Sequence, residues 1–203
     1  GHAHNNFGFS DPGVYRITYK ASAFRSNDGG DLPVGLIPVE SPVQSFYYAV
    51  GTYAEWKANY FEPHQLIDED PSDELPEVAH YHADNDGDGA GLLLEYAFNL
   101  SPQENDAEVV VPGSGLSGLP AVFLETSEDS PVLVVEYLRR RVSGAPRLDY
   151  FPEFSSALDS GWTSGGSEVV TPIDEIWERV QVRDSRPLPA GSQRFGRVRV
   201  ELW

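Results

Sequence analysis

Two hydrophobic periodicities divide the chain. In residues 15–21 and 44–50 apolar side chains alternate with polar ones, and Phe46, Tyr48 and Val50 fall on one face of the second segment. A period of two is typical of a β-strand with one buried face. The same period returns after residue 120, in short segments separated by turns rich in Gly, Pro and Ser, and predicts a C-terminal β-sandwich. We expect its strands at 121–125, 132–142, 148–154, 168–171, 177–183 and 194–203.

One glycine interrupts the alternation in the last of these segments. Beyond Gly196, apolar and charged residues alternate to the end of the chain, but Gly196 itself breaks the phase. A glycine inside a strand often marks a β-bulge, where one extra residue bends the backbone. We therefore expect a bulge at this position.

The middle of the chain follows a helical period instead. Tyr53, Trp56, Tyr60 and Phe61 recur at spacings near three and four, which predicts a short amphipathic helix over 53–61. After it, the chain to residue 83 is rich in Pro and acidic residues and is expected to be an extended linker. A second helix is expected over 92–100 (LLLEYAFNL), because Ser and Pro follow it and stop it.

These elements predict a mainly β chain with three parts. We expect a partial β-sandwich in residues 1–52, a helical and acidic linker in 53–111, and a C-terminal β-sandwich in 112–203. The fold class is thus two β-sandwich-like units joined by a short helical segment, and that segment carries an EF-hand-like loop.

The loop has the spacing of a calcium site. Counting Asp84 as position one, Asp86, Asp88 and Glu95 fall at positions three, five and twelve, with Gly89 at position six. Calcium is a hard cation that takes six to eight oxygen ligands, and a tight loop presents alternate side chains to it. Glycine allows the sharp turn at position six, where a Cβ would be costly. The sequence therefore predicts one calcium ion bound within 84–95.

The remaining positions of the loop are less regular. The backbone carbonyl of Ala90 is expected to be a ligand, and Glu95 to close the site with both oxygens. Leu92 stands at position nine, so the ligand there is water or missing. Gly91 stands where paired loops carry an apolar residue, which predicts a solitary site. The alternative is a solvated acidic loop that binds nothing.

Net charge narrows the choice of partners. The formal net charge is −18, and no Lys or Arg occurs between Tyr60 and Leu138. Such a field repels nucleic acid and anionic lipid and attracts divalent cations. No segment has the length of an apolar membrane span, and the absence of cysteine excludes disulfides and thiolate sites. We expect an extracellular or cell-surface protein with no nucleic-acid partner and no membrane insertion.

Motifs of catalysis are missing from the sequence. It contains no Gly-x-Ser-x-Gly, no His-Glu-x-x-His and no Gly-rich phosphate loop. A carboxylate pair for glycoside hydrolysis stays open in a chain this acidic. We expect that the protein is not an enzyme.

Two His-x-His pairs are candidates for a transition metal. On a strand, residues two apart point to the same side, so His2 and His4 could together bind zinc. His80 and His82 lie just before the acidic loop, where packing or hydrogen bonding is the simpler role. For both pairs the alternative is an ordinary surface or packed histidine.

The loop and the residues after it resemble a known class. Together with Leu93–Ala97 they are similar to the single Asp-rich calcium loops of large secreted bacterial proteins, which are related to dockerin and thrombospondin type 3 loops. In that class the loop often precedes a C-terminal β domain, and residues 121–203 resemble one, notably in 149–162 and 194–200. The resemblance implies a structural calcium site in a secreted protein.

The start of the chain resembles a second family. Its pattern is similar to the surface-anchored repeat of bacterial choice-of-anchor M proteins, although a Phe stands where that family has Trp. The family's domain has further strands before this point, which implies that the chain was cut or that another chain supplies them. The matching residues are His2, His4, Asn6, Phe7, Phe9, Pro12, Gly13 and Tyr15.

The sequence thus predicts a non-enzymatic structural or adhesive surface module with one structural calcium site. Its expected partners are other copies of itself or other surface proteins, with strands from another chain completing an assembly. The alternative is a module that binds zinc through the first two histidines, or glycans through aromatic side chains. The tryptophans that would stack on sugars are Trp56, Trp162, Trp177 and Trp203.

Overall fold

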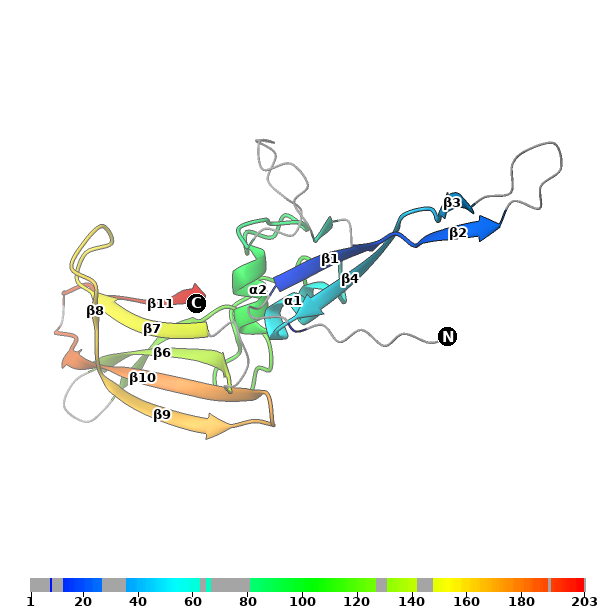
Figure 1. Cartoon of the computed structure of the whole chain (residues 1–203). Helices are drawn as coiled ribbons and strands as arrows, with labels where there is room; N and C mark the ends of the chain where they lie inside the picture. Colours follow the sequence, from blue (N-terminus) through cyan, green and yellow to red (C-terminus); the bar gives the residue numbers. More distant parts are fainter. Residues whose placement is uncertain are drawn as a thin grey trace.

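The computed structural model describes residues 8, 13–26, 36–62, 65–66, 81–126, 131–141, 148–189 and 191–202. The described residues are mainly β, with 47% of them in strands, and they form two helices and several antiparallel sheets. Figure 1 shows a sandwich of strands at one end, the helices in the middle and a long two-stranded ribbon at the other end.

Residues after 120 form the sandwich that their periodicity predicts. One sheet has the order β5-β6-β10-β9 and the facing one has the order β11-β7-β8, both antiparallel. In this part of the chain the predicted strands are confirmed to within a few residues, and of the strands described there only the two-residue β8 was missed. The strands are β5 (Ala121–Thr126), β6 (Pro131–Arg140), β7 (Leu148–Ser155), β8 (Thr163–Ser164), β9 (Ser167–Pro172), β10 (Trp177–Pro187) and β11 (Phe195–Leu202).

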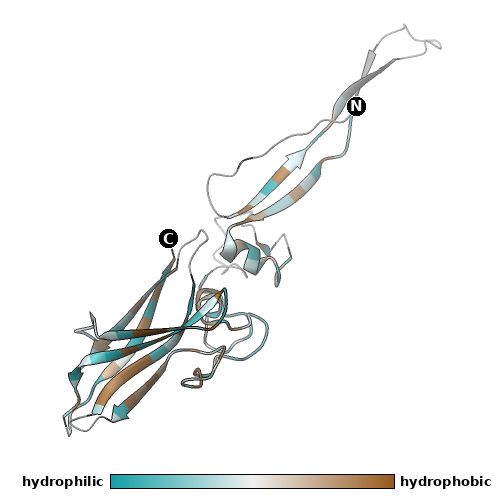
Figure 2. Cartoon of the chain, turned by 90° about the horizontal axis from the view of Figure 1, so that it is seen from below, coloured by the Kyte–Doolittle hydropathy of each residue, from teal (hydrophilic) through white to brown (hydrophobic). Residues whose placement is uncertain are grey.

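The core lies between the two sheets. Val135 and Tyr137 of β6 are fully buried against Phe154 of β7 and Val180 of β10. Figure 2 shows the hydrophobic and hydrophilic stretches along these strands. Strand β6 is buried on its other face as well. There Leu138 of β6 belongs to a second cluster with Val110, Ala121 and Trp177. This double cover explains why β6 reads as a nearly continuous apolar run.

The bulge expected in β11 is wrong. Cα pairing between β11 and β7 runs without a shift from Phe195↔Ser155 to Leu202↔Leu148, through Gly196↔Phe154. The reason for a glycine is space: a Cβ on Gly196 would lie 2.6 Å from Cγ2 of Val135 in the facing sheet. Gly196 therefore allows the two sheets to approach each other closely.

The two helices are shorter than expected. Helix α1 spans Thr52–Lys57, and turns replace the rest of its predicted length; helix α2 spans Leu92–Phe98. The end of α2 comes from Asn99, which adopts the left-handed conformation at φ 60°, and not from the Ser-Pro that follows. Asparagine is one of the few non-glycine residues that take this conformation at a helix end. Neither described helix has the length and the apolar composition of a membrane span.

The N-terminal part, expected as a partial sandwich, is a two-stranded ribbon in the described residues. β1 (Gly13–Tyr19) pairs antiparallel with β4 (Gln44–Val50), and β2 (Ser22–Ser26) pairs with β3 (Leu36–Glu40). The pairs Tyr15↔Tyr48 and Ile17↔Phe46 place apolar side chains on one face of the ribbon. Phe46 is 50% exposed, so this face is not covered by any described segment.

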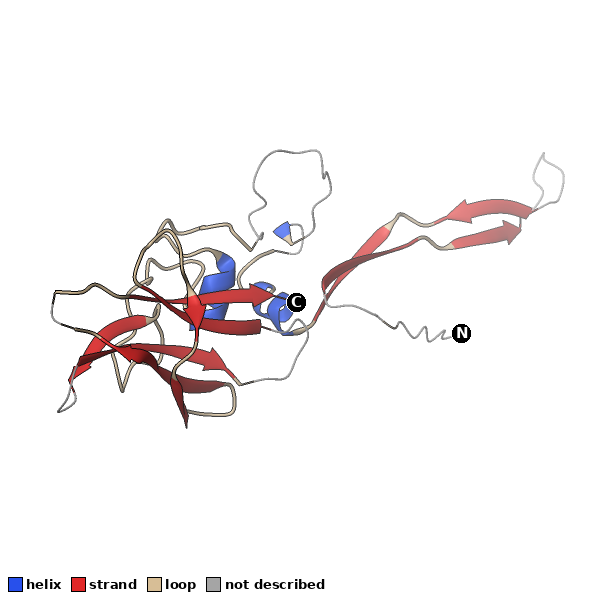
Figure 3. Cartoon of the chain, turned by 90° about the vertical axis from the view of Figure 1, so that its left-hand side faces the viewer, coloured by secondary structure: helices blue, strands red, loops and turns tan. Residues whose placement is uncertain are grey.

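The helices connect the ribbon to the sandwich, as Figures 1 and 3 both show. Helix α1 directly follows β4. The Tyr96 hydroxyl of α2 donates a hydrogen bond to Thr52 Oγ1 of α1 at 2.8 Å, and the Tyr96 ring lies 4.9 Å from that of Tyr53. On its other side α2 buries Ala97 and Phe98 in the sandwich core. Helix α2 is therefore shared between the two ends of the molecule.

Candidate metal centre

The acidic loop brings its three aspartates together. One carboxylate oxygen each from Asp84, Asp86 and Asp88 lies within 4.8 Å of the others. The loop folds because Gly87 and Gly89 adopt φ values of 79° and 93°, a region that side chains with a Cβ rarely enter. The sequence pattern anticipated the glycine at position six, whereas the one at position four is a further requirement of this turn.

Asp84 organises the loop through backbone hydrogen bonds. Its Oδ1 accepts from the N–H of Gly87 at 2.9 Å and of Asp88 at 3.2 Å, and its Oδ2 accepts from the N–H of Gly89 at 3.0 Å. In the same way, Asp86 Oδ1 accepts from Asp88 N–H at 3.2 Å. The carboxylates are therefore held in place by the main chain, which fixes where their remaining lone pairs point.

Glu95 is the most unusual group of the centre. It is fully buried on α2, and no donor in the described residues reaches either carboxylate oxygen. Burial, followed by the charges of Asp86, Asp88, Asp84 and Asp106, raises the pKa of Glu95 to about 8. Its oxygens are not part of the group of three that lies within 4.8 Å. A buried carboxylate without donors is costly in free energy, and a bound cation removes that cost.

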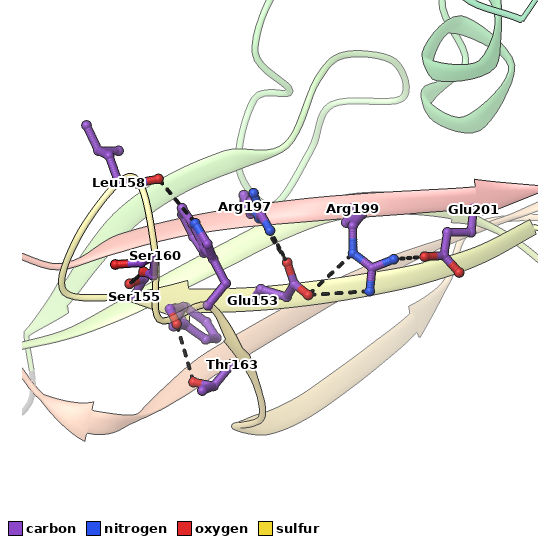
Figure 4. A network of polar contacts seen from close by, with 10 residues as sticks. Glu153, Ser155, Leu158, Ser160, Thr163, Arg197, Arg199 and Glu201 are labelled. Carbon is purple, nitrogen blue, oxygen red and sulfur yellow. Dashed lines mark hydrogen bonds and ion pairs between the residues drawn. The ribbon is translucent and has the colours of Figure 1, made fainter.

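The other buried carboxylates differ from Glu95 in having arginine partners. Glu136 Oε1 lies 3.0 Å from Arg179 Nε, and Asp184 Oδ2 lies 2.5 Å from Arg194 Nε. Glu153 accepts from Arg197 and Arg199 on the outer face of the sandwich, as Figure 4 shows. Among the described residues, these three and Glu95 are the buried acids, so Glu95 alone of them has no arginine partner.

A third unpartnered oxygen lies in the loop itself. Asp86 Oδ2 is buried and has no hydrogen-bond partner in the described part of the chain. Burial is also the main reason why the pKa of Asp86 is raised. With Glu95, three buried carboxylate oxygens thus lack donors. Hard divalent cations such as calcium prefer a ligand set made only of oxygens, so these residues fit that metal class.

Two further loop positions, Ala90 and Leu92, are both fully buried but differ in what they can offer a metal ion. Ala90 is fully buried, and its N–H donates to Asp88 Oδ1 at 2.8 Å; that its carbonyl is a ligand stays a prediction. Leu92 is fully buried against Phe61 and supplies no oxygen from its side chain. Loop position nine is therefore used for packing.

One acidic residue near the centre was missed by the sequence pattern. Asp88 Oδ2 accepts hydrogen bonds from the N–H groups of Asp106 at 3.1 Å and Ala107 at 2.8 Å. Asp106 lies eighteen residues beyond Asp88, outside any loop spacing. The available signal was the acidic run of Glu104, Asp106 and Glu108 that follows α2.

Of the four histidines in the two His-x-His pairs, the structure describes one. His2, His4 and His80 lie outside the described residues. His82 is described and exposed, and its ring centroid lies 4.1 Å from that of Tyr81. A Cβ on Gly91 would lie 3.1 Å from the His82 carbonyl oxygen, so this backbone packs closely on the loop.

Three of the four tryptophans of the carbohydrate alternative lie in the described residues, and each of them contacts other side chains of the chain. Trp56 packs in the cluster of Phe61 and Leu92. Arg197 lies over the ring of Trp162 at 4.1 Å, and Arg140 lies over the ring of Trp177 at 4.4 Å. Trp203 lies outside the described residues.

Comparison with known proteins does not place the chain in a family. No protein-family model, no curated protein and no solved structure matches it. The resemblances to the surface-anchored repeat and to the secreted calcium loops therefore remain predictions.

Proposed function

We propose that the chain is a non-enzymatic extracellular or cell-surface structural module that binds one calcium ion. The ligands are Asp84, Asp86, Asp88 and Glu95, with the backbone carbonyl of Ala90. The observation that carries the proposal is the complete burial of Glu95 beside the three aspartates, with no donor in the described residues.

Calcium suits this centre better than other common metals. Zinc prefers nitrogen or sulfur ligands, and the four acidic side chains offer only oxygen. Magnesium demands a near-ideal octahedron and keeps several waters, whereas calcium accepts a flexible oxygen cage. An extracellular role fits a dissociation constant of about 0.1–1 mM, the range in which extracellular calcium modules work.

The position of the site supports a structural role. Leu92, at the first turn of α2, packs with Phe61 and Trp56 on the side of the ribbon, while Phe98 at the other end of α2 packs in the sandwich core. Glu95 lies between these contacts on the same helix. An ion that holds Glu95 to the loop therefore stabilises α2, and through α2 the connection between ribbon and sandwich.

Calcium titration of EDTA-treated protein tests the proposal. We expect binding by calorimetry and a rise in melting temperature, since saturation at a hundred times the dissociation constant stabilises by roughly 2.7 kcal/mol. Asp86→Ala should abolish both effects. Asp159→Ala, at an exposed aspartate of the sandwich, is the matched control and should leave them unchanged. No binding and no shift at several millimolar calcium would exclude the proposed site.

A second element supports assembly with another copy of the chain. A two-stranded ribbon alone is at best marginally stable in water, and this one exposes Phe46, Tyr47 and Tyr48. The sequence of the described ribbon carries three basic residues and one acidic residue, whereas residues 51–126 carry one basic and sixteen acidic. Opposite charges therefore favour binding of the ribbon to the acidic middle part of a second copy.

Light scattering after size exclusion tests this assembly. We expect oligomers at micromolar concentration that dissociate in high salt and in the variant Phe46→Thr/Tyr48→Thr. Leu158→Thr, at a residue 70% exposed on the sandwich, is the control. A stable, folded monomer under all conditions would argue decisively against the assembly and would leave the calcium proposal unaffected.

A further inference from the structure

Asp106 reaches the centre from a segment outside the calcium loop. Resting on the calcium site proposed above, we propose that Asp106 is a further acidic group of that site. Its carboxylate faces the ion directly or through one bound water, and it replaces the ligand missing at loop position nine. The site is then formed by two segments, the loop Asp84–Glu95 and the segment Ser101–Ala107.

A shared carboxylate fixes the two segments together. Asp88 Oδ1 accepts from Ala90 N–H within the loop, at 2.8 Å. Asp88 Oδ2 accepts from Asp106 N–H at 3.1 Å and from Ala107 N–H at 2.8 Å. Asp88, a ligand of the proposed ion, thus accepts a hydrogen bond from the backbone of Asp106, which places the Asp106 side chain beside the acidic cluster.

The Asp106 side chain is also held in a single orientation. The N–H of Ser101 lies 3.2 Å from both of its carboxylate oxygens, so it donates to a partly buried group. Asparagine could accept the same hydrogen bond without a charge. A carboxylate at this place adds repulsion instead, because its charge is one of those that raise the pKa of Glu95. That repulsion becomes attraction when a cation is present.

The loop has no side-chain oxygen at position nine, which such a group would supply. Its side chain at position nine, Leu92, is fully buried against Phe61 and cannot turn toward the cluster without losing that packing. Calcium takes six to eight oxygens, and EF-hand loops often supply the ninth-position ligand through a water. Asp106 supplies an oxygen from outside the loop, which raises the number of protein ligands without disturbing the core.

The test compares Asp106→Asn with Glu104→Gln. Both variants remove one negative charge from the same segment, but Glu104 is exposed and makes no contact with Asp88 in the described hydrogen bonds. We expect Asp106→Asn to weaken calcium binding by about 10- to 100-fold, as the loss of groups that support a metal site commonly does. Glu104→Gln should change the affinity less than about twofold, because an exposed charge is screened. Asp106→Glu, which keeps the charge, should retain more affinity than Asp106→Asn.

The number of waters bound to Tb³⁺ in the site reports on ligation directly, and a purely structural role of Asp106 would leave that number unchanged. Luminescence lifetimes of bound Tb³⁺ in H₂O and D₂O count the waters on the ion. One additional water in Asp106→Ala, which leaves no side-chain oxygen, supports direct ligation, and an unchanged count with weakened binding supports the water-bridged contact. Calcium affinity equal to that of the wild type in Asp106→Asn overturns the inference. Failure of the wild type itself to bind calcium would overturn the proposed function instead, so the two failures are distinguishable.

Discussion

Of the neighbouring charges, Asp86 acts most strongly on Glu95, and each of the two residues carries buried oxygen that no described donor reaches. Their repulsion makes the metal-free fold unfavourable at the point where α2 begins. A cation between them reverses the sign of that interaction. The same pair therefore determines the behaviour of the protein toward both protons and metal.

The first prediction concerns the pH dependence of the metal-free protein. Glu95 has a pKa of 4.5 when unperturbed and about 8 in the fold, so the folded state binds its proton more tightly than the unfolded state does. This group's contribution to stability is complete below pH 4.5 and is lost as the pH rises toward 8. We expect the free energy of unfolding in EDTA to fall over this window by up to about 1.4 kcal/mol per pH unit. Urea unfolding at several pH values measures it; a slope that rises with pH and is unchanged by Glu95→Gln would contradict the assignment.

The second prediction is that Glu95→Gln has opposite effects with and without calcium. Glutamine removes the buried charge and keeps the shape, so in EDTA at pH 8–9 the variant should be more stable than the wild type. In saturating calcium it should be less stable, because a carboxylate ligand is lost. Thermal unfolding in both buffers checks the reversal, with Glu55→Gln at the exposed surface of α1 as the control. The same sign of effect in both buffers would exclude Glu95 as a ligand.

The third prediction concerns the close approach of the two sheets at Gly196. An alanine there would bring its Cβ to 2.6 Å from Val135 Cγ2, and overpacking of this kind costs about 1–3 kcal/mol. We expect Gly196→Ala to lower the free energy of unfolding by that amount, measured in urea. The double variant Gly196→Ala/Val135→Ala should show a coupling energy that restores part of the loss, because the clashing methyl is removed. Strictly additive effects would show that the two residues do not touch.

The fourth prediction concerns the buried ion pair of Asp184 and Arg194. The two side chains are only 2% and 7% exposed and lie 2.5 Å apart. Arg194→Met leaves an unpaired buried carboxylate and should cost about 3–5 kcal/mol, whereas Asp184→Leu/Arg194→Met together should recover much of the loss. The exposed pair of Lys20 and Glu40 is the control, and its loss should cost less than about 1 kcal/mol. Equal costs for the two pairs would refute the argument from burial.

Local features of the fold were predictable because neighbouring residues encode them. Alternation near the end of 194–203 predicted β11, since a strand with one buried face needs nothing beyond its own period, and the short apolar run in 132–142 predicted β6. The spacing of Asp84, Asp86 and Asp88 predicted that these carboxylates gather, because a tight loop turns alternate side chains inward.

Features that depend on distant segments were not predictable in this way. Gly196 was expected to be a bulge, because its true neighbour, Val135, lies some sixty residues earlier and on the other sheet. The N-terminal strands were expected to belong to a sandwich, and the described structure gives them only each other as partners.

The strand periodicity, the acidic loop and its aspartates follow from the sequence alone, because each depends on residues that are close together along the chain. Two features become visible only in the folded chain: Glu95 is buried with no arginine partner among the described residues, and Asp106 lies beside the loop. It also decided that α2 is shared between ribbon and sandwich. Burial and electrostatic environment are properties of a packed chain, and they arise only when segments far apart in sequence exclude water from the same place.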